Sequence, residues 1–89
     1  MTINYNNLPL HMQDGARLYV EHGVPPGPFL TALICDDLYE AFGRADDINE
    51  SRIQDWARFF HNDAPSTCWG SPAKMAAWIA QGGMNAVAA

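Results

Sequence analysis

The stretch "PFLTALICDDLYEAFG", residues 28–43, decides the fold class because its apolar residues recur with the period of an α-helix. On a helical wheel they form one stripe. The stripe consists of Leu30, Ile34, Leu38 and Ala41, with Leu33 and Phe42 at its edges. Pro28 suits the first turn of a helix, and Gly43 suits the position after the last turn. The stretch therefore predicts an amphipathic helix over residues 28–42.

Similar apolar stripes predict three more helices, over residues 9–22, 48–62 and 72–81. Gly23 is a stop for the first of them, and Ser71 before a proline begins the last with a capping hydroxyl. The alternation of apolar and polar residues that is typical of a β-strand persists nowhere. The sequence therefore predicts an all-α fold, a single small domain of about four short helices.

The inward faces of these helices predict the core. It should contain Leu30, Leu33, Ile34, Leu38, Ile53, Trp56, Phe60, Trp78 and Ile79. Gly15, in the middle of the first helix, costs about 1 kcal/mol relative to alanine, which suggests that a neighbouring element approaches it closely. Residues 1–7 are polar and residues 84–89 carry mostly small side chains, so both ends are expected to be flexible.

Length and composition limit the function classes. The 89 residues leave room for one domain, and a chain of this size buries only about 60% of its unfolded surface, so aromatic residues must supply much of the core. Ten acids against five bases give a net charge of −5, which argues against binding nucleic acid through its phosphates. The sequence has neither an apolar run of membrane-spanning length nor a signal-peptide pattern, so we expect a cytoplasmic protein.

Patterns for metals, cofactors and catalysis are weak. We interpret Cys35 and Cys68 as reduced intracellular thiols, and the three histidines show no metal-ligand spacing. A glycine-rich phosphate loop between a strand and a helix is also missing from the sequence. We therefore expect no metal and no cofactor. An enzyme built on Cys68 or Asp37 is the least supported class, because neither residue has an identifiable catalytic partner.

The pattern Asp-Asp-x-x-Glu occurs twice, at residues 36–40 and again at residues 46–50. In the second copy, Asp47 and Glu50 have the spacing of a capping box, in which the first side chain accepts from an amide of the first turn and the second reaches back. Asp46 serves as the cap if the helix begins one residue earlier. We interpret this copy as structural, as the start of the third helix.

The first copy lies inside the predicted second helix. Asp36 and Glu40 fall on its flank and are expected to face water. Asp37 falls within the apolar stripe, where an unpaired carboxylate is costly. We interpret Asp37 as a structural acid, bonded to the amides near Ser71 or to the indole of Trp69, in preference to a general acid or base.

Several motifs in a fixed order resemble a family of small uncharacterised proteins from bacteriophages and prophages. They are "HMQDG" with a later aromatic residue, "GVPPGPFLTALICDDL", "GRADDIN", "NDAPSTCWGSP" and "AWIAQGG", and together they span about residues 8–84. The resemblance implies an accessory protein of a phage, made in the cytoplasm of a bacterial host. It implies no particular biochemical activity.

In that setting the leading expectation is a small acidic protein that binds a host protein and inhibits or modulates it, for example a defence complex of the CRISPR type. The expected contact surface is Asp36, Tyr39 and Glu40, with Trp69 in the loop after the third helix. Two carboxylates one turn apart would attract a basic partner, and the tyrosine would add an amphipathic contact.

Two alternatives remain open. One is a sponge for a small ligand or nucleotide, whose basic pocket would require a homo-oligomer because the chain has only five bases. The other is a transcriptional regulator, which the acidic third helix and the lack of a basic face disfavour. We expect neither direct nucleic-acid binding nor membrane binding.

Overall fold

The computed structural model describes residues 3–84, and every regular element among them is helical. In chain order the elements are η1 (Leu10–Met12), α1 (Gln13–His22), α2 (Pro28–Ile34), α3 (Leu38–Arg44), α4 (Asp47–Ser51), α5 (Ile53–Arg58), η2 (Phe59–Asp63), η3 (Ser66–Cys68) and α6 (Pro72–Gln81). The all-α prediction is confirmed. Within this part of the chain, every helix is too short or too polar to cross a membrane.

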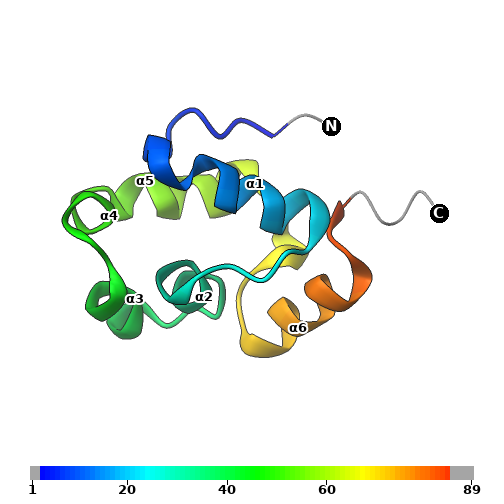
Figure 1. Cartoon of the computed structure of the whole chain (residues 1–89). Coiled ribbons are helices and arrows are strands. Elements are labelled where there is room, and N and C mark those ends of the chain that lie inside the picture. Colours follow the sequence, from blue (N-terminus) through cyan, green and yellow to red (C-terminus); the bar gives the residue numbers. More distant parts are fainter. Residues whose placement is uncertain (1–2, 85–89) are drawn as a thin grey trace.

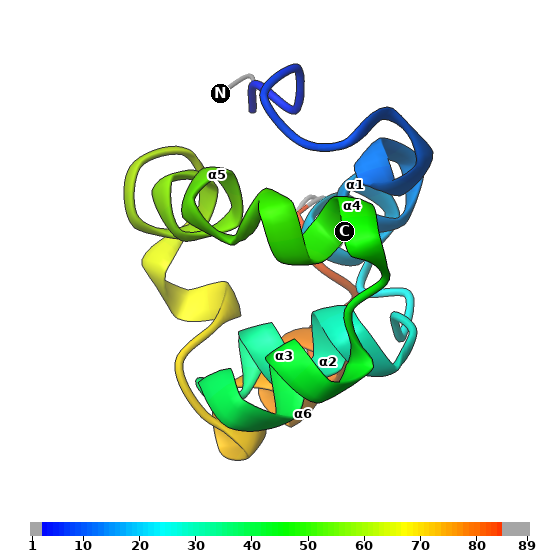
Figure 2. The same ribbon diagram turned by 90° about the vertical axis from the view of Figure 1, so that its left-hand side faces the viewer.

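The helices lie in two layers (Figures 1 and 2). One layer holds α1, α4 and α5, with α4 at a steep angle to α5, and the other holds α2, α3 and α6. Both layers send buried side chains into the core, among them Tyr19 from α1, Ile34 from α2 and Trp56 from α5. The Trp56 ring stacks on Phe60 at 6.3 Å and meets Phe29 edge-on at 5.7 Å. Aromatic side chains thus supply the bulk that a chain of this length needs.

The predicted core is largely confirmed. Five of the nine residues are buried, namely Leu30, Ile34, Trp56, Phe60 and Trp78, and three pack partly buried against them, namely Leu33, Ile53 and Ile79. The prediction is wrong for Leu38, which is 55% exposed. The buried residues also include Tyr19 and Cys68. The hydroxyl of Tyr19 donates a hydrogen bond to the backbone carbonyl of Cys68 at 2.6 Å.

The predicted helix over residues 28–42 is in fact two helices, α2 and α3, joined by a sharp turn. Asp36 has a left-handed backbone with φ 62°. The N–H groups of Asp36 and Asp37 donate back to the carbonyls of Leu33 at 3.1 Å and Ala32 at 2.9 Å, which closes the end of α2. Glycine usually holds this position, but aspartate is among the few other residues that adopt it. The turn sets α3 in a new direction and leaves Leu38 outside the core.

The predicted helix over residues 48–62 is interrupted as well. It begins at Asp47, and the backbone of Arg52 leaves the helical range at φ −114° and ψ 16°. Asn49 is buried before the break, and its Oδ1 accepts the indole N–H of Trp56 at 3.2 Å. After α5 the chain forms one turn of π-helix, η2, which is wider than an α-helix. The consecutive residues Phe59 and Phe60 in this turn are both buried.

The last turn of α6 is held against the end of α1, and we call this contact the C-terminal clasp. The indole N–H of Trp78 donates to the carbonyls of Tyr19 and Val20, each at 3.1 Å. Gly83, at φ 76°, lies so close to α1 that a Cβ there would meet three backbone atoms of residues 21–23 at 2.6 Å. Glycine is therefore required at the clasp by both backbone conformation and space.

Two smaller predictions concern Gly15 and the chain ends. Nothing lies within 4 Å of a Cβ built at Gly15, so the expected close approach there is wrong and occurs at the clasp instead. Of the ends expected to be flexible, the structure places Ile3 in the core and the Tyr5 ring 5.5 Å from Phe59. Residues 1–2 and 85–89 lie outside the described residues.

Candidate functional site

The first acidic pattern, residues 36–40, forms the turn between α2 and α3. Asp37 caps α3, because its carboxylate accepts the backbone N–H of Glu40 at 3.1 Å. The prediction that Asp37 bonds to the loop near Ser71 or to Trp69 is wrong, since the break at Asp36 places Asp37 at the exposed start of a new helix. The backbone makes this link instead, through the N–H of Gly70, which donates to the carbonyl of Ile34 at 2.7 Å.

The second acidic pattern caps α4, one residue earlier than the capping box predicts. The cap is Asp46, whose carboxylate accepts the N–H of Asn49 at 2.7 Å. Asp47 is the first helical residue, so its assignment as the cap is wrong, while Glu50 lies in the first turn as expected. The Asn49 amide, together with the His11 ring nitrogen at 2.9 Å, lowers the pKa of Asp46 below its ordinary value.

Charge is distributed very unevenly along the chain. Residues 36–50 contain six of the ten acids and one of the five bases, so their formal charge is −5, equal to that of the whole chain. The remaining residues contain four acids and four bases. Several of these pair with one another, as Arg17 does with Asp14 at 3.8 Å and as Arg58 does with Asp55 at 3.9 Å. All the net negative charge therefore lies in α3, α4 and the turns that begin them.

The same stretch exposes apolar side chains. Four of the seven large apolar residues that are exposed among residues 3–84 belong to it, namely Leu38, Tyr39, Phe42 and Ile48. Tyr39 is 95% exposed, which leaves almost the whole ring in solvent. We call residues 36–50 the acidic–apolar end. Figure 2 views the molecule from this end, with α3 and α4 in front.

The four predicted contact residues are only partly brought together. Tyr39 is on the surface, as expected. Asp36 and Glu40 are not one turn apart on a single helix, because the chain turns between them, so that part of the prediction is wrong. Glu40 also accepts from the Arg44 side chain at 2.6 Å, which offsets much of its charge. Trp69 lines a groove together with Leu38, the first residue of α3.

An apolar groove of about 110 Å³ runs beside the start of α3. Its apolar walls are Leu33, Leu38, Ile53, Trp56, Ala57, Phe60 and Trp69. Asp36 and His61 also line it and are its ionisable groups. Sites for drug-sized molecules are typically about 300–1,000 Å³, so this groove suits a single side chain rather than a cofactor.

Trp69 carries a buried polar group that lacks a partner. Its Nε1 is the one buried side-chain nitrogen or oxygen without a hydrogen bond among the residues that the structure describes. The ring is fixed by aromatic neighbours, Phe60 at 5.9 Å and His61 at 4.8 Å. A buried N–H without an acceptor costs about 1–3 kcal/mol, so the position of this ring lowers the stability of the fold.

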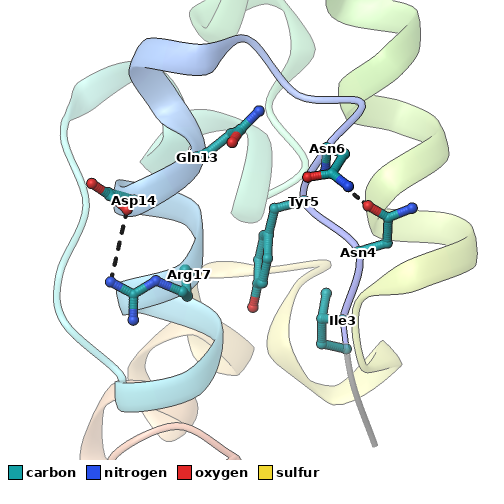
Figure 3. A pocket seen from close by; sticks show the side chains of 7 residues that line it. All are labelled: Ile3, Asn4, Tyr5, Asn6, Gln13, Asp14 and Arg17. Carbon is teal, nitrogen blue, oxygen red and sulfur yellow. Dashed lines mark hydrogen bonds and ion pairs between the residues drawn. The ribbon is translucent and has the colours of Figure 1, made fainter.

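Two larger hollows are open to solvent. One, of about 380 Å³, lies between the N-terminal segment and α1 and is lined by Tyr5, Asp14 and Arg17 among others (Figure 3). The other, of about 490 Å³, includes Arg44 and Asp46. Each contains one cation that already faces an acid, as Arg17 faces Asp14 in Figure 3. A phosphate or nucleotide site needs several converging donors, which these described residues do not supply in one chain.

The cysteines are poorly suited to nucleophilic chemistry. Cys68 is fully buried, and burial raises the pKa of its thiol to about 12. Burial likewise raises the pKa of Cys35, whose sulfur lies 3.7 Å from that of Met75. Since the thiolate is the reactive form, both thiols are held in the unreactive state. Residues 3–84 contain no cluster of three or more histidine, cysteine or acidic residues placed to hold a metal.

No protein-family model, curated protein or solved structure matches the chain. Function is therefore inferred from the charges, exposed side chains and hollows of this chain. Sequence reasoning identified the acids and Tyr39 but missed the groove, because its walls come from α2, α3, α5 and the Trp69 loop. The sequence shows that Trp69 and Phe60 are present, but it does not show that they lie close to Leu38.

Proposed function

We propose that this chain is a protein-binding module that uses its acidic–apolar end to occupy a basic surface of a partner protein. The proposal rests on one observation. Residues 36–50 hold all the net charge of the chain and most of the large apolar side chains that are exposed among residues 3–84. A surface that only keeps a protein in solution does not need exposed aromatic rings among its acids. Charges steer a partner of opposite sign toward the surface, and the apolar groups then supply affinity.

Tyr39 is the residue best suited to anchor such a complex. Its ring is 95% exposed, and tyrosine is enriched among the few residues that contribute most to protein interfaces. Leu38 and Phe42 flank it on α3, at 55% and 44% exposure. Their burial against a partner would add apolar contact area next to the acids.

The sequence resemblance supports a setting for this activity. A small acidic protein of a phage, in the cytoplasm of a bacterial host, meets host defence complexes whose nucleic-acid channels are basic. Occupation of such a channel would inhibit the complex without any chemistry on the part of the inhibitor. We therefore propose a host protein as the partner and inhibition or modulation as the outcome.

The alternative classes receive less support from the geometry. A ligand sponge would have to assemble cations from several chains, because the two larger hollows each contain one cation facing an acid. A transcriptional regulator would need a helix with a free basic face, but Arg52 and Arg58 near the middle of the chain both face Asp55.

The test begins with capture of the partner from a lysate of the bacterial host, followed by affinity measurements on the purified pair. Asp36→Asn combined with Asp47→Asn removes two charges from the acidic–apolar end, and asparagine tolerates the left-handed backbone of residue 36. Asp14→Asn combined with Asp63→Asn removes two charges elsewhere and is the matched control. Exposed charge pairs contribute about 0.2–1 kcal/mol each, so the loss of two should raise Kd roughly 2- to 30-fold.

The control variant should leave Kd unchanged to within about twofold, and the affinity of the unmodified chain should fall as salt rises. If both double variants weaken binding equally, only net charge matters and the acidic–apolar end is not the binding surface. If binding is insensitive to salt and to all four changes, the proposed function fails.

A further inference from the structure

We infer that the groove beside α3 receives one aliphatic side chain from a basic segment of the partner, while an arginine or lysine of that segment faces Asp36. This inference rests on the proposed function and specifies the partner's chemistry. The groove adjoins the acidic–apolar end, because Leu38 and Asp36 belong to both. A segment that meets α3 therefore meets the groove as well.

The size of the groove selects an aliphatic side chain. A closed cavity of about 150 Å³ lined by apolar residues holds a benzene molecule, and this groove is smaller, at about 110 Å³. Apart from Asp36 and His61 its walls are apolar, so a leucine, isoleucine, valine or methionine side chain fits it both in volume and in chemistry. A cofactor or nucleotide is too large and too polar.

The polar groups of the groove select a basic segment of polypeptide. Asp36 is exposed, has a left-handed backbone and makes no ion pair within residues 3–84, so its carboxylate is free to meet a cation. An aliphatic side chain next to a cation describes a short basic segment.

Charge argues against a second copy of this chain as the occupant. Two copies meeting through this surface would bring together two stretches that each carry a formal charge of −5. Like charges placed opposite each other across an interface cost free energy, whereas a basic segment gains it. The structure therefore favours a partner of opposite charge over self-association at this site.

A displayed library of random peptides of about twelve residues, long enough for three helical turns, tests the inference on the purified chain. Peptides are selected on the unmodified chain and then on the variant Ala57→Leu. Ala57 is exposed, helical and part of the groove wall, so leucine there fills the groove without disturbing the core. Ala76→Leu, at an exposed position of α6, is the matched control.

The inference predicts selected peptides that pair an aliphatic residue with an arginine or lysine within one helical turn. Their binding, followed by tryptophan fluorescence, should weaken about tenfold or more in Ala57→Leu and stay within about twofold in Ala76→Leu. Leu38→Ser removes one wall and provides a second test if Ala57→Leu lowers the melting temperature.

Three results of the peptide selection would overturn the inference. They are the absence of any enriched peptide, enrichment of acidic peptides, and equal binding to the unmodified chain and to Ala57→Leu. A dimer in size-exclusion chromatography that Ala57→Leu converts to a monomer would also overturn it, because a second copy would then occupy the groove. The captured partner separates the two proposals: if it binds Ala57→Leu normally but is lost when the acids of residues 36–50 are neutralised, the groove inference fails and the proposed function stands.

Discussion

Trp78 and Trp69 belong to neighbouring segments of the chain, yet their indole N–H groups lie in opposite situations. The N–H of Trp78 donates to two carbonyls at the end of α1, each at 3.1 Å, as part of the C-terminal clasp. The N–H of Trp69 is buried beside the groove and has no acceptor within the described structure. At the clasp the indole N–H is hydrogen-bonded within the protein. Around Trp69 a donor has no acceptor within residues 3–84, and an apolar groove and exposed aromatic side chains lie nearby.

The difference indicates where stability and binding reside. At the clasp, backbone meets backbone at a glycine, and the contact leaves no room for another molecule. At the acidic–apolar end, four large apolar side chains and the whole net charge face solvent. Natural proteins retain such unsatisfied features chiefly where function requires them, since each one lowers the stability of the isolated chain.

The largest expected effect is at the clasp. Gly83→Ala should lower the free energy of unfolding by about 2–4 kcal/mol, because a Cβ would lie 2.6 Å from backbone atoms of residues 21–23 and φ is 76°. Chemical denaturation measures this loss. Gly15→Ala is the control, and it should gain about 0.5–1 kcal/mol because that position is helical and open. Equal stabilities for the two variants would remove the clasp from this account.

The two tryptophans give the next effect. Trp78→Phe should lower stability by about 1–3 kcal/mol, because it leaves the carbonyls of Tyr19 and Val20 without their shared donor. Trp69→Phe should change stability by less than about 1 kcal/mol, because removal of a buried N–H that lacks an acceptor in the described structure offsets the loss of ring contacts. A larger loss at Trp69 than at Trp78 would reverse the comparison.

A smaller effect depends on pH. The pKa of Asp46 is held below its ordinary value of 3.8, chiefly by the Asn49 amide. A carboxyl with a lowered pKa stabilises the folded state above its ordinary pKa, and this contribution is lost as pH falls through the lowered value. Asp46→Ala should therefore lower the melting temperature at pH 6. At acid pH the melting temperatures of the variant and the unmodified chain should come closer together.

Asp47→Ala is the control for this change, because Asp47 does not cap α4. Its melting temperature should follow that of the unmodified chain across the same pH range. The nearby ionisable groups, His11 on η1 and Glu50 on α4, are present in both variants and in the unmodified chain. If Asp47→Ala is the more damaging of the two, the cap has been assigned to the wrong residue.

How far the sequence predicts this fold depends on how local the cause is. Helix α6 was predicted to the residue, because Ser71, Pro72 and Gly82 are the strongest local markers for a start and a stop. The break between α2 and α3 was not predicted, because the residue that takes the left-handed position is Asp36 rather than a glycine. The wheel pattern continues unbroken across it, so only tertiary packing reveals that Leu38 faces out.

The candidate site divides in the same way. The acids and Tyr39 could be found from residue types alone, and their exposure required only that α3 lie at the surface. The groove and the unpaired N–H of Trp69 arise where segments distant in sequence meet. Nothing in the local sequence around residue 69 indicates that its N–H lacks an acceptor.

The most direct test of the central claim compares two exposed apolar side chains in binding to the captured partner. Tyr39 is 95% exposed in the acidic–apolar end, and Leu10 is 84% exposed on η1 outside it. Truncating either to alanine should leave the melting temperature unchanged, since neither side chain packs in the core. Titration calorimetry with the purified partner should give a Kd raised about tenfold or more by Tyr39→Ala and by less than about twofold by Leu10→Ala. Unchanged affinity for Tyr39→Ala, or equal losses for both variants, would contradict the claim that residues 36–50 are the binding surface.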